Sequence, residues 1–170
     1  MTGDRPPTQP PRSGGSGGSS GSASSVVEAG AVTVFQLGDQ TYGLAVSATR
    51  EIVPVENLID VPRAPAPVLG MFPLRGGAIA LIDTPAILGL AIETAPRKAL
   101  VIMRGDAPLC GITVDAVLGV VRTDALELTP VEPGREPAAV LGFLTTPDGR
   151  TVTLLDTTTV LGRIEALASH

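Results

Sequence analysis

Two short stretches of the chain decide its fold, because one repeats the other. Residues 34–39 read VFQLGD, and residues 101–106 read VIMRGD, 67 positions later. Further matching pairs follow in the same order: GLAV at 43–46 with GITV at 111–114, and IALIDT at 79–84 with VTLLDT at 152–157. Self-similarity at a nearly fixed offset is the signature of a duplicated structural unit. The sequence therefore predicts two copies of one unit, over about residues 31–92 and 97–163.

Each copy has the pattern of an all-β unit. Its apolar runs are short and rich in Val, Ile and Leu, and Gly, Pro and Asp separate them, which is typical of a barrel or a sandwich. Residues 32–37 and 41–46 are predicted to form a hairpin. Residues 78–82 are apolar without alternation and are predicted to form a buried strand. We expect two small pseudo-symmetric β-barrels that share a continuous core, since each alone is too small to be very stable.

The composition limits the classes of partner. The 170 residues carry a net charge of −5 and include three Phe, one Tyr and no Trp. Nucleic acid is therefore not expected as a partner, because its recognition needs a basic surface and aromatic residues on which bases stack. No stretch reaches the roughly 20 apolar residues of a membrane helix, and the N-terminus has no apolar signal region. We therefore expect a cytoplasmic protein without direct membrane insertion.

The two ends of the chain and its one cysteine limit the kinds of catalytic or metal site that the chain can form. Residues 1–25 hold seven Ser, six Gly and four Pro and are predicted to form a disordered tail before a folded part over 26–170. Cys110, the single cysteine, can form no internal disulfide and is predicted to be a small buried hydrophobe. The single histidine, His170, is the last residue, where chains fray. We therefore predict no catalytic triad, no metal site and no cofactor.

An Asp-Thr pair follows an apolar strand in each repeat, within Asp83-Thr84-Pro85 and Asp156-Thr157-Thr158. Asp before the first helical turn is typical of a helix start, because its carboxylate accepts amide protons that have no partner within the helix. Pro within that turn is equally typical. We predict Asp83 and Asp156 as helix caps, the second before a C-terminal helix over about 157–168. The alternative is an aspartyl hydrolase, whose two carboxylates share a proton. That catalytic loop needs Gly where this chain has Pro or Thr, so capping is favoured.

What remains is a surface for other proteins. Residues 69–77 read LGMFPLRGG and place large apolar side chains and Arg75 between glycines. In one interpretation Met71, Phe72 and Leu74 fill the core and Arg75 is a solvated turn residue. In the other the segment is an interface, where Met, Phe and Arg are enriched. Glu51 is ambiguous in the same way.

Taken in order, these segments resemble the CheW-like domain of bacterial chemosensory systems. The resemblance spans nearly all of residues 30–165 and is carried by FQLGDQTYGL at 35–44, REI at 50–52, LRG at 74–76, GITVDAV at 111–117 and LLD at 154–156. It implies an all-β fold of two SH3-like five-stranded barrels with short helices and a C-terminal helix. It also implies a non-catalytic adaptor that couples methyl-accepting chemoreceptors to a CheA-type histidine kinase, in membrane-associated arrays. Its implied partners are the regulatory domain of that kinase and the helical hairpin tip of the receptor.

The resemblance also assigns site residues. Glu51, Leu74 and Arg75 match the part of the family associated with the receptor-facing groove between the barrels. Arg75 carries a planar fork of donors that suits a backbone or carboxylate group of a receptor helix. Pro73 stands where the family usually has Asn, and it lacks both a polar side chain and a backbone donor. This difference bears on receptor affinity and on the choice of receptor.

Overall fold

The computed structural model describes residues 30–93, 97–124, 126–132 and 139–169. The tail expected over 1–25 lies outside these residues. Within them the chain is mostly β. The elements are β1 (Ala31–Leu37), β2 (Gln40–Ala45), a 3₁₀ turn η1 (Val46–Ala48), β3 (Thr49–Pro54), β4 (Val68–Leu74), β5 (Gly77–Ile82), α2 (Thr84–Leu88), β6 (Lys98–Arg104), β7 (Ala107–Val114), β8 (Ala116–Arg122), β9 (Glu127–Pro130), β10 (Val140–Thr145), β11 (Thr151–Leu155) and α3 (Thr157–Leu167).

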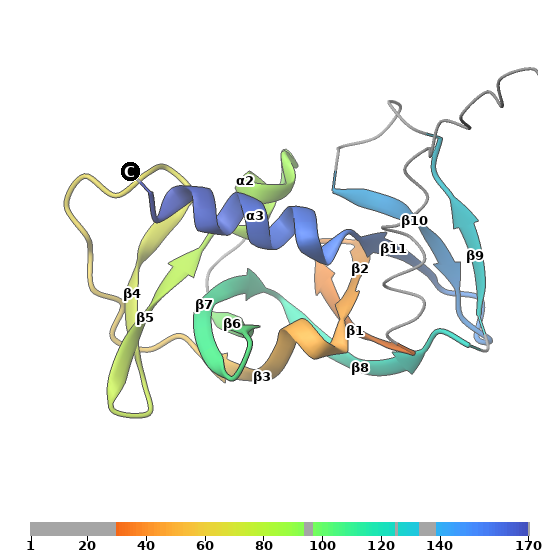
Figure 1. The fold of residues 1–170 in the computed structure, drawn as a ribbon, viewed down its shortest axis with the longest axis horizontal. Coiled ribbons are helices and arrows are strands. Elements are labelled where there is room, and N and C mark those ends of the chain that lie inside the picture. The colour runs from red at the N-terminus through yellow and green to blue at the C-terminus, as the bar shows by residue number, and fades with distance from the viewer. Residues whose placement is uncertain (1–29, 94–96, 125, 133–138, 170) are drawn as a thin grey trace, which may run out of the picture.

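The strands form two sheets. Sheet A has the order β8-β1-β2-β11-β10-β9, and sheet B has the order β3-β6-β7-β5-β4. Neighbouring strands are antiparallel except for one parallel pair in each sheet, β2 with β11 and β5 with β7. Figure 1 shows β4 and β5 at the left end of the molecule, β9 and β10 at the right end, and α3 across the top.

The sheets do not coincide with the sequence repeats. β1 and β2 belong to the first repeat but lie in sheet A with the strands of the second, and β6 and β7 make the reverse exchange into sheet B. The expectation that residues 31–92 and 97–163 would each form one barrel is therefore wrong, although every strand of the first repeat has an equivalent in the second. The periodicity of a sequence gives the length of a unit but not the sheet that each strand joins. The exchange pairs edges that each repeat alone would expose.

A second difference lies at one edge of each sheet. The resemblance implied five strands in each barrel, whereas sheet A has six because β9 pairs with β10. In sheet B the corresponding edge of β4 meets only an isolated bridge between Ile59 and Met71. At both edges the neighbouring segment passes so close to the strand that only glycine fits. A Cβ atom on Gly142 would lie 2.5 Å from the Thr129 carbonyl oxygen, and one on Gly70 would lie 2.6 Å from that of Ile59.

The core consists of three clusters, and the largest is shared by both sheets, as predicted. The largest combines residues of both sheets with Ile164 of α3, including Phe35 and Leu44 from sheet A and Leu100 and Ile112 from sheet B. A second cluster is built mainly on strands of sheet A, and a third, around Phe72, on strands of sheet B. The predicted fold class is confirmed: the structure has two similar sheets, short helices and a C-terminal helix, and the largest apolar cluster joins the two sheets.

Candidate protein-interaction site

The turn between β4 and β5 displays Arg75. Leu74 pairs with Gly77, so Arg75 and Gly76 alone form the connection. Their φ angles are +48° and +80°. Positive φ at both positions is the pattern of the tight hairpin turn whose twist matches its strands. Glycine adopts this conformation freely, whereas Arg75 does so at a cost. The backbone therefore holds the Arg75 side chain at the tip of a rigid hairpin.

Arg75 forms an ion pair with Glu51, the other charged residue predicted for the site. Arg75 Nη2 lies 2.5 Å from Glu51 Oε1, and the two side chains are 59% and 30% exposed. Glu51 lies on β3 and Arg75 follows β4, and these strands are the opposite edges of sheet B. The pair thus links the two edges. An ion pair this exposed contributes about 0–1 kcal/mol to stability, and the remaining N–H donors of the guanidinium are available to a partner.

Some residues of the 69–77 segment belong to the core and others are accessible to a partner protein. Phe72 is 1% exposed and belongs to the third core cluster, so it is a core residue. Leu74 and Met71 are half-buried, and Pro73 is exposed. The interface interpretation therefore rests on Arg75 and Leu74.

Pro73 lies where its missing N–H does no harm to the hairpin. The backbone N–H and C=O of Met71 point out of the sheet edge, since both bond to Ile59 at 2.8 and 2.7 Å. Residues two apart in a strand direct their backbone groups the same way, so the nitrogen of Pro73 also faces the free edge. Proline is tolerated at such edge positions. The difference from the family at this position alters the sheet edge and leaves the β4–β5 pairing intact.

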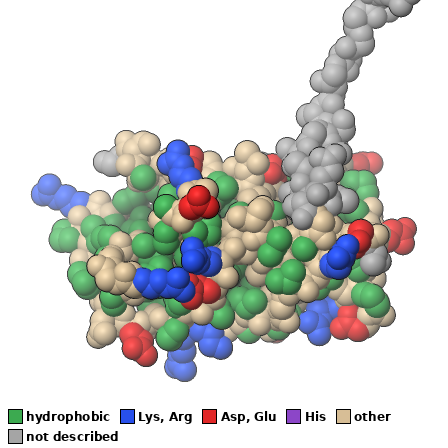
Figure 2. Space-filling model, turned by 60° about the horizontal axis from the view of Figure 1, so that its bottom comes forward, with side chains coloured by type: hydrophobic (Ala, Val, Ile, Leu, Met, Phe, Trp, Pro, Cys, Tyr) green, Lys and Arg blue, Asp and Glu red, His purple; other side chains and the backbone are tan. Residues whose placement is uncertain are grey.

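A groove lies between the two sheets on the β3 and β8 side. Its volume is about 290 Å³, and it is lined by Ile52, Val53, Pro54, Lys98, Ala116 and Val117. Ile52 is 39% exposed and directly follows Glu51 in β3. Figure 2 shows the side of the molecule that lies at the bottom of Figure 1, with hydrophobic side chains spread over the surface and charged ones among them.

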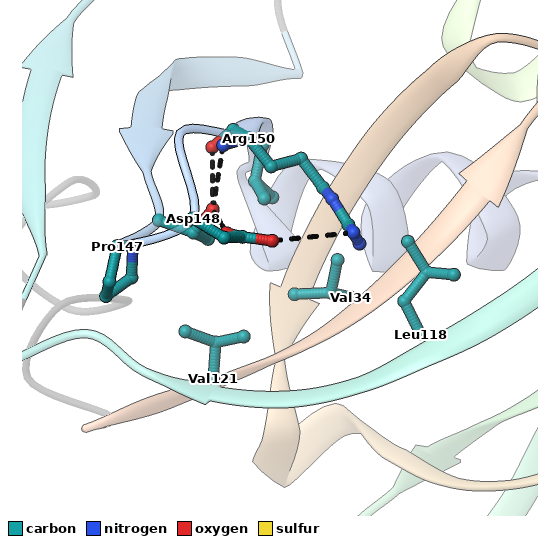
Figure 3. Close-up of a pocket in the computed structure, with 8 residues that line it drawn as sticks. Val34, Leu118, Val121, Pro147, Asp148 and Arg150 are labelled. Atoms are coloured by element: carbon teal, nitrogen blue, oxygen red, sulfur yellow. Dashed lines mark hydrogen bonds and ion pairs between the residues drawn. The ribbon is translucent and has the colours of Figure 1, made fainter.

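A second hollow, of about 180 Å³, lies in sheet A. Its apolar lining is Val34, Leu118, Val121 and Val152, and the β10–β11 turn forms its rim. Figure 3 shows Arg150 and Asp148 of this turn directed toward each other, with Nη2 and Oδ2 3.5 Å apart. A hydrogen bond donated by Thr146 Oγ1 is the main cause that lowers the pKa of Asp148. This turn is equivalent to the one that carries Arg75. Its arginine, Arg150, pairs with a residue of the same turn, whereas Arg75 pairs with Glu51 of another strand.

The two predicted caps differ. Asp83 and Asp156 both hold the N-cap position, of α2 and α3. Asp156 Oδ1 accepts from the N–H of Thr158 at 3.1 Å, whereas the Asp83 carboxylate makes no cap hydrogen bond. The reason is Pro85, which takes the place of Thr158 and has no N–H to donate. Side-chain capping is therefore wrong for Asp83. The hydrolase alternative needs the two carboxylates to share a proton, whereas Asp156 bonds to the start of its own helix.

The threonine after each aspartate has a role that the sequence analysis missed. Thr84 Oγ1 donates to the Thr113 carbonyl at 2.6 Å, and Thr157 Oγ1 accepts from the Ala45 N–H at 3.1 Å. Thr113 and Ala45 are equivalent positions at the ends of β7 and β2, the exchanged strands. Each threonine thus forms a hydrogen bond that connects the start of a helix to a strand of the other repeat. The repeated Asp-Thr pair was the available signal.

The remaining chemistry is sparse. Cys110 is buried, and this burial raises the pKa of its thiol to about 12. Among the described residues no group of three or more His, Cys, Asp or Glu could hold a metal ion. In the same part of the chain, no helix is both long and apolar enough to span a bilayer. The groove, the hollow and the Arg75 turn are features of a protein that acts through contacts with other proteins.

Comparison with known proteins shows which family of interaction proteins the chain belongs to. Residues 31–165 match the model of the CheW-like domain family, and the chain belongs to this family. The chemotaxis protein CheW of Rhizobium meliloti is 32% identical over 97 residues, which are 56% of this chain but less than two thirds, 63%, of that relative. The CheW of Thermotoga maritima is 27% identical over 137 residues, 78% of this chain and 88% of the relative.

A solved structure supports the fold. The scaffolding protein TtCheW from Thermoanaerobacter tengcongensis superposes with a TM-score of 0.58 at 24% identity, over 74% of this chain and 87% of that one. The agreement extends the family assignment to the architecture of the two sheets.

Proposed function

We propose that this protein is a non-catalytic adaptor that couples methyl-accepting chemoreceptors to a CheA-type histidine kinase. Membership of the CheW-like family supports the pathway. The observation that carries the proposal is the presence of two surfaces with no lining residue in common. β8 contributes Ala116 and Val117 to the groove, and Leu118 and Val121 to the hollow. An adaptor needs two such sites, because both partners must be bound at once.

The groove is the receptor side. The cytoplasmic tip of the receptor is a helical hairpin in this proposal, and an apolar groove accepts the apolar face of a helix. Glu51, Leu74 and Arg75 complete the receptor contact in this proposal, and the Arg75 guanidinium bonds a backbone carbonyl or carboxylate of the hairpin. Glu51 holds Arg75 in place from β3.

The hollow is the kinase side. Its apolar lining and exposed Leu118, at 42%, suit an apolar side chain from the homologous regulatory domain of the kinase, with Asp148 and Arg150 as a polar rim. The protein acts in the cytoplasm and is recruited to membrane-associated receptor arrays through these contacts. It needs no cofactor.

One pair of variants tests both assignments. Ile52→Asp places a charge in the groove and Leu118→Asp places one in the hollow, and both side chains are exposed enough for the fold to tolerate the change. Binding of the purified protein to receptor hairpin fragments and to the kinase regulatory domain of its own organism is measured by calorimetry. We expect Ile52→Asp to weaken only receptor binding and Leu118→Asp only kinase binding. Wild-type protein that binds neither partner contradicts the adaptor role.

A further inference from the structure

Among the described residues, Lys98 is the only charged one that lines the groove. It begins β6, and the register places it directly opposite Pro54 of β3. The other lining residues are apolar. Within the described part of the chain, no carboxylate lies within ion-pair distance of its ammonium group. The groove therefore presents one unneutralised positive charge at the margin of an apolar surface.

At the equivalent position of sheet A, the positive charge is paired with a carboxylate. Lys98 and Pro54 correspond to Ala31 and Arg122 of sheet A, which also lie opposite each other. There the single cation, Arg122, bonds Asp124 at 2.6 Å. The residue equivalent to Asp124 is Glu56, yet Glu56 makes no ion pair with Lys98. Among the described residues, the cation of sheet A is thus paired within the chain, whereas Lys98 of sheet B has no such pair.

The strand edges beside the groove disfavour a strand as that partner. The β3–β6 register shifts between Thr49 and Ile52, and the β8–β1 register shifts at Leu118. Pro54, at the end of β3, has no N–H to donate. Irregular edges and proline obstruct the addition of a strand. A helix needs no edge hydrogen bonds, because its own backbone satisfies them, and it can combine an apolar stripe with a carboxylate one turn away.

We propose that Lys98 is a specificity-determining residue, which pairs with a carboxylate on an amphipathic helix whose apolar stripe occupies the groove. This inference rests on the proposed function, because the helix is that of the receptor hairpin. Lys98 then discriminates among receptors by the charge that they place one turn from the apolar stripe. Like charges at this point exclude a receptor, which is the usual contribution of electrostatics to partner choice.

The test uses the full chain and the hairpin fragments of its own organism's receptors. The variants are Lys98→Met, which keeps an unbranched apolar stem, and Lys98→Glu. The matched control is Arg104→Met, because Arg104 ends the same strand, carries the same charge and pairs with Glu165 at 3.2 Å. Affinities are measured at low and at high NaCl, and binding to the kinase regulatory domain is measured in parallel.

We expect Lys98→Met to weaken hairpin binding about fivefold at low salt and less at high salt. Lys98→Glu should weaken it further, and a hairpin with the facing carboxylate replaced by Lys should restore it. The control and kinase binding should be unchanged. Hairpin affinity that is equal in wild type and both Lys98 variants would overturn the inference while leaving the adaptor role in place. Wild-type protein that binds no hairpin would remove the proposed function itself.

Discussion

Two replacements of Arg75 separate its contribution to binding from its contribution to stability. Both Arg75→Ala and Arg75→Gly remove the ion pair with Glu51, which is half exposed and contributes about 0.5 kcal/mol. They differ in the backbone, because φ at this position is +48°. Alanine pays for this left-handed conformation and glycine does not, a difference of about 1 kcal/mol. We expect Arg75→Ala to be slightly less stable than wild type, and Arg75→Gly to be about 1 kcal/mol more stable than Arg75→Ala.

Binding should not follow this order. Removal of an arginine that anchors an interface costs about 2 kcal/mol, roughly thirtyfold in affinity, and both variants lose the same guanidinium. Glu51→Ala should weaken binding less, since it only releases Arg75. Urea unfolding gives the stabilities, and calorimetry with a receptor hairpin fragment gives the affinities. Unchanged affinity in both Arg75 variants would refute the receptor contact, and an Arg75→Gly protein less stable than Arg75→Ala would refute the backbone argument.

Three further predictions concern the scaffold. Gly142→Ala should destabilise the fold by several kcal/mol, because its Cβ would lie 2.5 Å from a carbonyl oxygen of β9; Gly162→Ala, in α3 with open space around it, should stabilise by about 0.5–1 kcal/mol in the same unfolding assay. Asp156→Ala should cost about 1 kcal/mol, whereas Asp83→Ala should cost far less, and equal losses would contradict the role given to Pro85. Cys110 has its thiol pKa raised to about 12, so a thiol reagent at pH 8 should modify it only after denaturant is added.

The sequence repeat was sufficient to predict the two-fold architecture. Short apolar runs at equivalent positions gave the strands, and the Asp-Thr pairs gave both helix starts. The exchange of β1–β2 and β6–β7 could not be predicted, because either arrangement buries the same apolar faces and follows the same periodicity. The sixth strand of sheet A was missed as well, since residues 127–130 have no alternating pattern that distinguishes them from a loop.

The candidate site was predicted in part. Arg75 and Glu51 were singled out by chemistry and resemblance, and the structure places them in contact. Their pairing was not predicted, because 24 positions separate them and only the meeting of the sheet edges brings them together. Lys98 and the groove residues of β8 carried no signal as single strand residues. Their position becomes informative only when β3 and β8 are recognised as equivalents that meet at the junction of the sheets.

Two differences between the repeats concern the interior of each sheet and the turn at its end. Phe72 fills the interior of sheet B, and its equivalent in sheet A is the smaller Leu144, which pairs with Val152 in the lining of the hollow. The equivalent turns differ in the same way: Arg75 reaches across sheet B to Glu51, whereas Arg150 remains with its own turn. A duplicated unit starts with two identical surfaces, and identical surfaces would compete for the same partner. Substitutions at these positions, with the shared core retained, make equivalent regions of the two sheets unlike, as the proposed adaptor between two different proteins requires.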